Sequence, residues 1–179
     1  MRRLVDSKIA NTSGCQIWWS KIIPLKVRCF VWKAAMGKIP VADALSYRGI
    51  TVQNTNCQFC GNFTETADHT LISCTYTKEV WTWIWKWCEI PDPHITKVSE
   101  VLDFAAAWGN CPKKRNTLHL VIYSNLWNIW LARNNKLFNK MGAVPTKIAD
   151  ETIDRSYEWK KYRGKGHGSW AEWCCTPFS

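Results

Sequence analysis

Three cysteines and one histidine fall in the part of the chain that is poorest in apolar residues. Between residues 50 and 74, Asn, Thr, Gly and Cys dominate, and neither a helical nor a strand period is maintained. Such a segment buries too little apolar surface to offset its loss of conformational entropy, so something other than a core must hold it. The spacing Cys57-x2-Cys60-x8-His69-x4-Cys74 is typical of a metal site.

The four side chains suit one zinc ion. Cys57 and Cys60 can direct both thiolates at one ion, and Gly61 lets the backbone turn beside them. His69 and Cys74 are about one helical turn apart, at the start of the next helix. Four nitrogen and sulfur ligands leave no open coordination position, so the expected Zn²⁺ is structural and not catalytic. The alternative interpretation is a set of reduced core cysteines beside a surface histidine.

Cysteine usage and hydropathy indicate an intracellular protein, nuclear or cytoplasmic. The chain has nine Cys, an odd number, and the basic residues 1–3 are not followed by the apolar run of a signal peptide. Without export, a disulfide framework is not expected. No run of about 18 apolar residues is present, so no transmembrane helix and no membrane partner are expected.

Helical periodicity dominates the rest of the 179 residues, with Pro and Gly between the periodic stretches. Helices are expected over residues 17–23, 25–36, 41–48, 73–88, 98–108, 113–140 and 146–162. The predicted fold class is mostly α: a small helical domain with one zinc-held loop, followed by long C-terminal helices. The expected divisions are a flexible leader (1–15), a zinc-binding domain (16–90), a helical C-terminal region (91–163) and a flexible tail (164–179).

The net charge of +10 favours polyanionic partners, because a cationic surface releases the counterions of phosphates. Two basic clusters are candidate nucleic-acid contacts, with ordinary solvated faces as the alternative: Lys26, Arg28 and Lys33, and Lys113, Lys114 and Arg115. The 13 Trp residues fit either a core or a surface on which bases stack, and core packing is the favoured interpretation.

The segments around the ligands form a longer pattern. It comprises Trp18-Trp19, Ile23-Pro24-Leu25-Lys26-Val27-Arg28, Lys38-Ile39-Pro40, Cys57-x2-Cys60-Gly61, Glu65-Thr66-Ala67-Asp68-His69, Cys74 and Trp81. A later part is Leu126-Trp127-x2-Trp130-x2-Arg133-Asn134-x3-Phe138. Over residues 18–140 this pattern resembles the zinc-binding domain of plant non-LTR (LINE-type) retrotransposon reverse transcriptases.

The resemblance implies zinc binding and a position after the polymerase domain of a retroelement protein. It implies a role near template RNA or target DNA, with a reverse transcriptase domain as a further partner. The chain departs from the family at Val41, where Thr is usual, and at Thr70 and Leu71, where a Leu or Phe pair is usual. These departures affect packing and leave the ligands unchanged.

The carboxylates of polymerase and ribonuclease chemistry are missing. No Asp-Asp pair occurs that could hold two catalytic metals. Asp150, Glu151, Asp154 and Glu158 recur at helical spacing, which indicates a solvated helix face. We therefore expect no enzyme, but a zinc-binding, nucleic-acid-associated accessory domain from the C-terminal part of a retrotransposon reverse transcriptase protein. The alternative is a structural or protein-interaction domain without nucleic-acid binding, from a degenerate gene copy.

Overall fold

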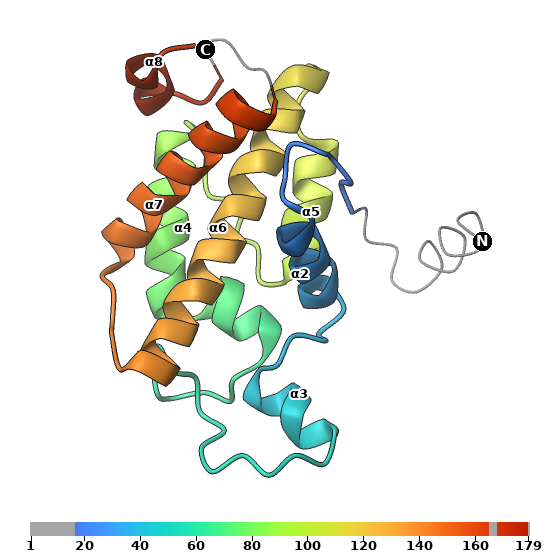
Figure 1. Cartoon of the computed structure of the whole chain (residues 1–179), viewed down its shortest axis with the longest axis vertical. Coiled ribbons are helices and arrows are strands. Elements are labelled where there is room, and N and C mark those ends of the chain that lie inside the picture. Colours follow the sequence, from blue (N-terminus) through green and yellow to red (C-terminus); the bar gives the residue numbers. More distant parts are fainter. Residues whose placement is uncertain (1–16, 165–167, 179) are drawn as a thin grey trace, which may run out of the picture.

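The computed structural model describes residues 17–164 and 168–178, and the fold in these ranges is helical (Figure 1). One isolated β-bridge, between Asn56 and Thr64, is the only β pairing there. The fold class predicted from the sequence is therefore confirmed. The leader expected over residues 1–15 lies outside the described residues. Within the described part of the chain, no helix combines the length and the apolar character that a bilayer crossing requires.

Most helices lie close to the positions that periodicity predicts, and α8 was not predicted. They are α2 (Leu25–Ala35), α3 (Ala42–Tyr47), the π-helix η1 (His69–Ser73), α4 (Thr75–Trp87), α5 (Val98–Ala107), α6 (Pro112–Asn139), α7 (Pro145–Glu158), the π-helix η2 (Trp159–Arg163) and α8 (Trp170–Cys175). Proline begins both α6 and α7, where its fixed φ and missing N–H group suit the first helical turn.

Helix α6 is the centre of the fold. Its residues are buried almost without interruption from Leu118 to Arg133, so it is covered on most sides. It packs against α2, α5 and α7, and α7 also packs against α4 (Figure 1). One continuous apolar core extends from α2 through α7 and so crosses the division expected at residue 90. Only three of the 13 Trp side chains are exposed, namely Trp19, Trp83 and Trp170.

Residues 17–24, called the strap below, are not helical, and the helix predicted over 17–23 is wrong. A helix of seven residues makes too few hydrogen bonds to form unless packing supports it. Packing favours another conformation here: the backbone N–H of Trp18 donates to the Tyr123 hydroxyl at 2.9 Å. The Trp18 ring also stacks on His119 with ring centroids 5.1 Å apart. The strap is therefore held on α6 by side chains.

The segment from residue 164 was expected to be a flexible tail, but its described part contains the docked helix α8. Ser169 caps this helix, and its side chain accepts a hydrogen bond from the Glu172 N–H. Trp173 is buried, and its indole N–H donates to the Ile153 carbonyl at 3.1 Å. The Trp87 indole N–H lies 3.2 and 3.0 Å from the carbonyls of Trp173 and Cys174, so two indoles fix a segment whose surrounding composition indicates a loop.

A buried ion pair joins the zinc-binding segment to α6. Glu65 is fully buried, and Arg133 of α6 donates to it with Nε at 2.8 Å and with Nη2 at 2.5 Å. The same carboxylate accepts the backbone N–H of Ala42 at 3.1 Å, at the start of α3. The Arg133 guanidinium also lies 5.0 Å from the centre of the Trp130 ring. Glu65 therefore connects the loop, α3 and α6 at one point.

We predict that breaking this ion pair from either side destabilises the fold. Glu65→Gln or Arg133→Met leaves one buried charge without its partner, which costs about 3–5 kcal/mol of unfolding free energy. The double variant should lose less than the sum of the two single changes, because neither charge remains unpaired. Urea unfolding with zinc present measures this, and the exposed Lys147→Met is the control, expected within about 0.5 kcal/mol of the wild type. Additive losses in the double variant would contradict the prediction.

Candidate metal centre

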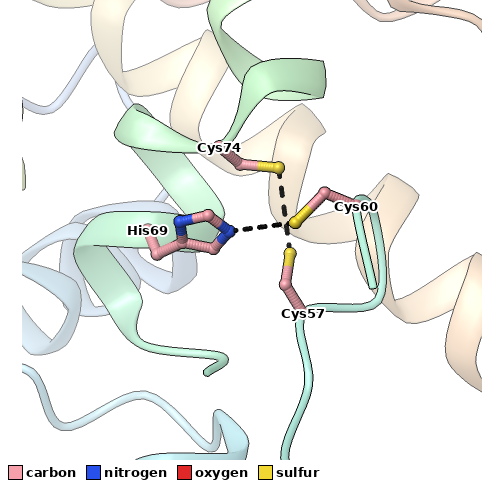
Figure 2. Close-up of side chains that lie close together, drawn as sticks. All are labelled: Cys57, Cys60, His69 and Cys74. Carbon is pink, nitrogen blue, oxygen red and sulfur yellow. Dashed lines mark hydrogen bonds between the residues drawn. The ribbon is translucent and has the colours of Figure 1, made fainter. Parts of the chain in front are cut away.

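The four residues predicted from spacing converge on one point (Figure 2). The ligand atoms of Cys57, Cys60, His69 and Cys74 all lie within 4.8 Å of one another. Cys57 and Cys74 are buried, and Cys60 and His69 are partly buried. Among the described residues this is the only group of at least three Cys, His, Asp or Glu side chains placed to hold a metal ion.

The distances match a tetrahedral zinc site. A tetrahedron with Zn–S bonds of about 2.3 Å has edges of about 3.8 Å between sulfurs. The sulfurs of Cys57 and Cys74 are 3.8 Å apart, and the Cys60 sulfur lies 3.3 Å from His69 Nε2. Three sulfurs and one nitrogen complete the coordination, so the centre holds one structural Zn²⁺ and leaves no position for a reacting water.

A short turn presents the first two ligands. The Cys57 N–H donates to the Phe63 carbonyl at 2.7 Å, and the Gly61 N–H donates to the Cys57 carbonyl at 2.9 Å. Gly61 has φ of +71°, a left-handed conformation that a side chain would disfavour. The turn therefore folds back within a few residues and brings Cys60 beside Cys57.

Helix ends present the other two ligands. His69 opens the π-helix η1, and its backbone N–H donates to the Thr66 hydroxyl at 3.1 Å. Cys74 stands immediately before α4, and its N–H donates to the His69 carbonyl at 2.8 Å. This single wide turn sets the separation of the two ligands. The turn is anchored in the core because Leu71 is buried and its carbonyl accepts the Trp81 indole N–H at 2.9 Å.

Two further contacts fix the cysteine turn to the helices. The Phe59 ring stacks on Tyr76 of α4 with centroids 4.5 Å apart and planes 10° from parallel. Lys136 of α6 donates to the Phe59 carbonyl at 3.2 Å. Burial, with the charges of Glu79 and Cys74, raises the pKa of Tyr76 to about 12, so its ring stays neutral. The zinc-binding turn therefore rests on both α4 and α6.

The buried thiols of Cys57 and Cys74 are hydrogen-bonded to each other, and this contact changes the pKa of both. Cys57 donates its proton to Cys74, and this hydrogen bond, followed by burial, raises the pKa of Cys57. The same hydrogen bond lowers the pKa of Cys74 to about 5 against the effect of burial, and the N–H groups of Tyr76 and Thr77 help. Zinc binding displaces the proton that the Cys57 thiol retains, because both sulfurs bind the metal as thiolates.

Comparison with known proteins agrees with this geometry. The model of the family described as zinc-binding in reverse transcriptase matches residues 3–81. The matched stretch contains all four ligands and ends inside α4. No curated protein and no solved structure is significantly similar to the chain. The N-terminal part of the chain is therefore similar to the zinc-binding domains of reverse transcriptases.

The two groups of basic residues proposed from the sequence lie on α2 and at the start of α6. On α2, Lys26 lies 5.6 Å from the ring centre of Trp127, whereas Arg28 lies 5.9 Å from that of Trp19 in the strap. Lys33 is exposed near the other end of α2. The second cluster, Lys113, Lys114 and Arg115, lies in the first turn of α6, where Arg115 donates to the carbonyls of Trp108 and Gly109 at 3.2 and 2.8 Å.

Three residues that position the metal centre were not predicted from the sequence. Glu65 and Arg133 entered only as parts of a motif, although Arg133 is the only charged residue between Arg115 and Lys136 of the central helix. Asp68 was also missed; it accepts the Val98 N–H at 2.8 Å and so fixes the start of α5 beside the His69 turn. The isolated guanidinium of Arg133 was the available signal, because Glu65 and Asp68 lie in a polar loop where a carboxylate is ordinary.

We predict one zinc equivalent per chain after purification without added metal. Cys60→Ser should lose most of this zinc, because a hydroxyl is a poor substitute for a thiolate ligand. Cys111→Ser is the matched control, since Cys111 is exposed and lies outside the centre. Metal analysis by inductively coupled plasma measures both variants. Full zinc content in Cys60→Ser protein would disprove the assignment.

We also predict that zinc removal loosens residues 50–80 more than residues 113–140. The loop has few buried apolar side chains, so metal binding energy, about 10–16 kcal/mol in zinc-finger peptides, takes the place of a core. Helix α6 retains its apolar contacts without metal. Hydrogen exchange with and without a chelator tests this. Equal loss of protection in both regions would show that the metal holds the whole fold.

Proposed function

We propose that this chain is a zinc-stabilised, nucleic-acid-associated accessory domain from the C-terminal part of a non-LTR retrotransposon reverse transcriptase protein. The observation that carries the proposal is the closed centre of three cysteines and one histidine inside the segment that matches reverse transcriptase zinc-binding domains. The zinc acts structurally, and the domain contributes binding rather than catalysis.

Charge supports nucleic acid as the ligand. The net charge is +10, and the candidate cations on α2 and at the start of α6 are Lys26, Arg28, Lys33, Lys113, Lys114 and Arg115. Such side chains contact phosphates, which are the same in every sequence, so binding tolerates sequence changes. RNA and DNA both carry such phosphates, so both are proposed ligands. A reverse transcriptase domain is the proposed protein partner.

One observation favours the alternative of a protein-interaction domain. Phe138, Met141 and Val144 are 71%, 68% and 62% exposed where α6 connects to α7. Three large apolar side chains exposed within seven residues are typical of a surface that another protein covers. A domain that packs on a polymerase would use such a surface whether or not it also binds nucleic acid.

We predict weak, salt-dependent binding to nucleic acid. The dissociation constant should lie at roughly 10⁻⁴–10⁻⁶ M at physiological salt and should rise steeply with salt, because each phosphate contact releases counterions. Fluorescence anisotropy with labelled 20-nucleotide RNA and DNA over a series of salt concentrations measures this. If no binding occurs even at low salt, the nucleic-acid function is excluded and the interaction domain takes its place.

A further inference from the structure

Carboxylates are absent from long parts of the sequence. No Asp or Glu occurs between Asp6 and Asp43, or between Asp103 and Asp150, and none occurs in the run 159–164. The first stretch contains the strap, the second contains all of α6, and the third is η2 with the residue after it. Where such segments meet in the fold, cations gather with few carboxylates to neutralise them.

The fold brings these three segments together at one end of the bundle. Arg163 of η2 donates to the strap carbonyls of Ile22 and Lys21 at 2.8 and 3.1 Å. The strap in turn lies on α6, where Trp18 stacks on His119, one helical turn from Arg115. In Figure 1 the strap, the end of α7 and the beginning of α6 lie side by side at the top of the view.

The resulting surface, called the strap face below, is cationic. Its exposed cations are Lys21, Lys113, Lys114, Lys161 and Arg163. Three cations here are already engaged: Arg163 holds the strap carbonyls, Arg115 binds the carbonyls of residues 108 and 109, and Lys160 lies 4.4 Å from the ring centre of Trp173. Lys161 lies 5.3 Å from the ring centre of Tyr157. The nearest carboxylate along η2 is Glu158, which precedes it. The strap face therefore presents several cations on three different segments.

Two exposed aromatic rings belong to the same segments, and each has a cation beside it: Arg28 lies 5.9 Å from the ring centre of Trp19, and Lys161 lies 5.6 Å from that of Tyr162. Trp19 is 46% exposed and stands three residues from Ile22, whose carbonyl accepts from Arg163. Tyr162 is 75% exposed and directly precedes Arg163. Large exposed rings beside cations are the combination that binds unpaired bases, because the rings stack on bases while the cations meet the backbone. A duplex keeps its bases stacked inside and cannot use the rings.

We propose that the strap face binds single-stranded nucleic acid, with phosphates on its lysines and bases stacked on Trp19 and Tyr162. This inference rests on the proposed function and specifies its footprint and strand state. The cysteine turn and α3 lie at the opposite end of the molecule (Figure 1). The zinc centre therefore does not contact the bound strand; it stabilises the other end of the domain.

The cationic part of the proposal is tested with two charge-matched variants. The triple change Lys113→Gln, Lys114→Gln and Lys161→Gln removes three charges from the strap face and retains Arg163 and Arg115, which hold backbone carbonyls. The control triple Lys78→Gln, Lys86→Gln and Lys97→Gln removes three exposed charges from α4 and the start of α5. The strap-face variant should lower the slope of log K against log salt by about two for a single strand, and the control should leave it near the wild-type value.

The aromatic part is tested with Tyr162→Ala and Trp19→Ala, and Trp83→Ala is the control because Trp83 is also exposed, at 48%, but lies on α4. Each strap-face change should weaken single-strand binding about tenfold and leave duplex binding nearly unchanged. Comparing the dissociation constants of RNA and DNA single strands of the same sequence shows whether ribose or deoxyribose is preferred. Circular dichroism and zinc content confirm that each variant is folded.

The double variant Lys26→Glu with Lys33→Glu shows whether nucleic acid binds at α2 instead of at the strap face. It therefore tests the location of the binding surface separately from the proposed nucleic-acid-binding function. If this α2 variant loses binding while the strap-face triple binds as the wild type does, the footprint is on α2 and the inference is wrong, but the proposed function stands. If the wild type binds a duplex as tightly as a single strand, the stacking role is wrong. If the wild type binds neither, both the inference and the nucleic-acid function fail.

Discussion

The buried pair of Glu65 and Arg133 is the interaction on which the arrangement of this protein depends. A fully buried carboxylate requires a partner, and its partner lies 68 residues along the chain, in the central helix. Because the same carboxylate accepts the first N–H of α3, the pair fixes the cysteine loop, α3 and α6 together. The segment that matches reverse transcriptase zinc-binding domains ends at residue 81, yet it is held in place by a helix outside that match.

The helical bundle and the cysteine loop are stabilised by different interactions. The helices α2 and α4 to α7 share an apolar core around α6 and depend on the burial of Trp, Leu, Ile and Val side chains. The loop before η1 has little to bury, and there the metal supplies the constraint. The stacked pair of Phe59 and Tyr76 and the contact of Lys136 with the Phe59 carbonyl connect these two parts. The zinc-binding loop and the helical core therefore stabilise each other through these few contacts.

This division bears on function. A closed centre of three thiolates and one imidazole offers no coordination position for chemistry, so the metal organises the end of the domain that contains α3. The segments without carboxylates meet at the other end, where the strap joins η2 to α6. This arrangement agrees with the proposed function, in which a polyanion binds at the end without carboxylates and away from the metal.

The sequence by itself determined the four zinc ligands, because their spacing is local, and it determined most helices, because periodicity is local too. It did not determine the conformation of the strap, where the contacts of Trp18 with α6 outweigh the helical tendency of seven residues. It did not reveal the docking of α8 through Trp173, nor the pairing of Glu65 with Arg133. These features depend on which distant residues become neighbours. Only the tertiary structure decides this, because burial of a charge or an indole is a property of the assembled core and not of the segment that carries it.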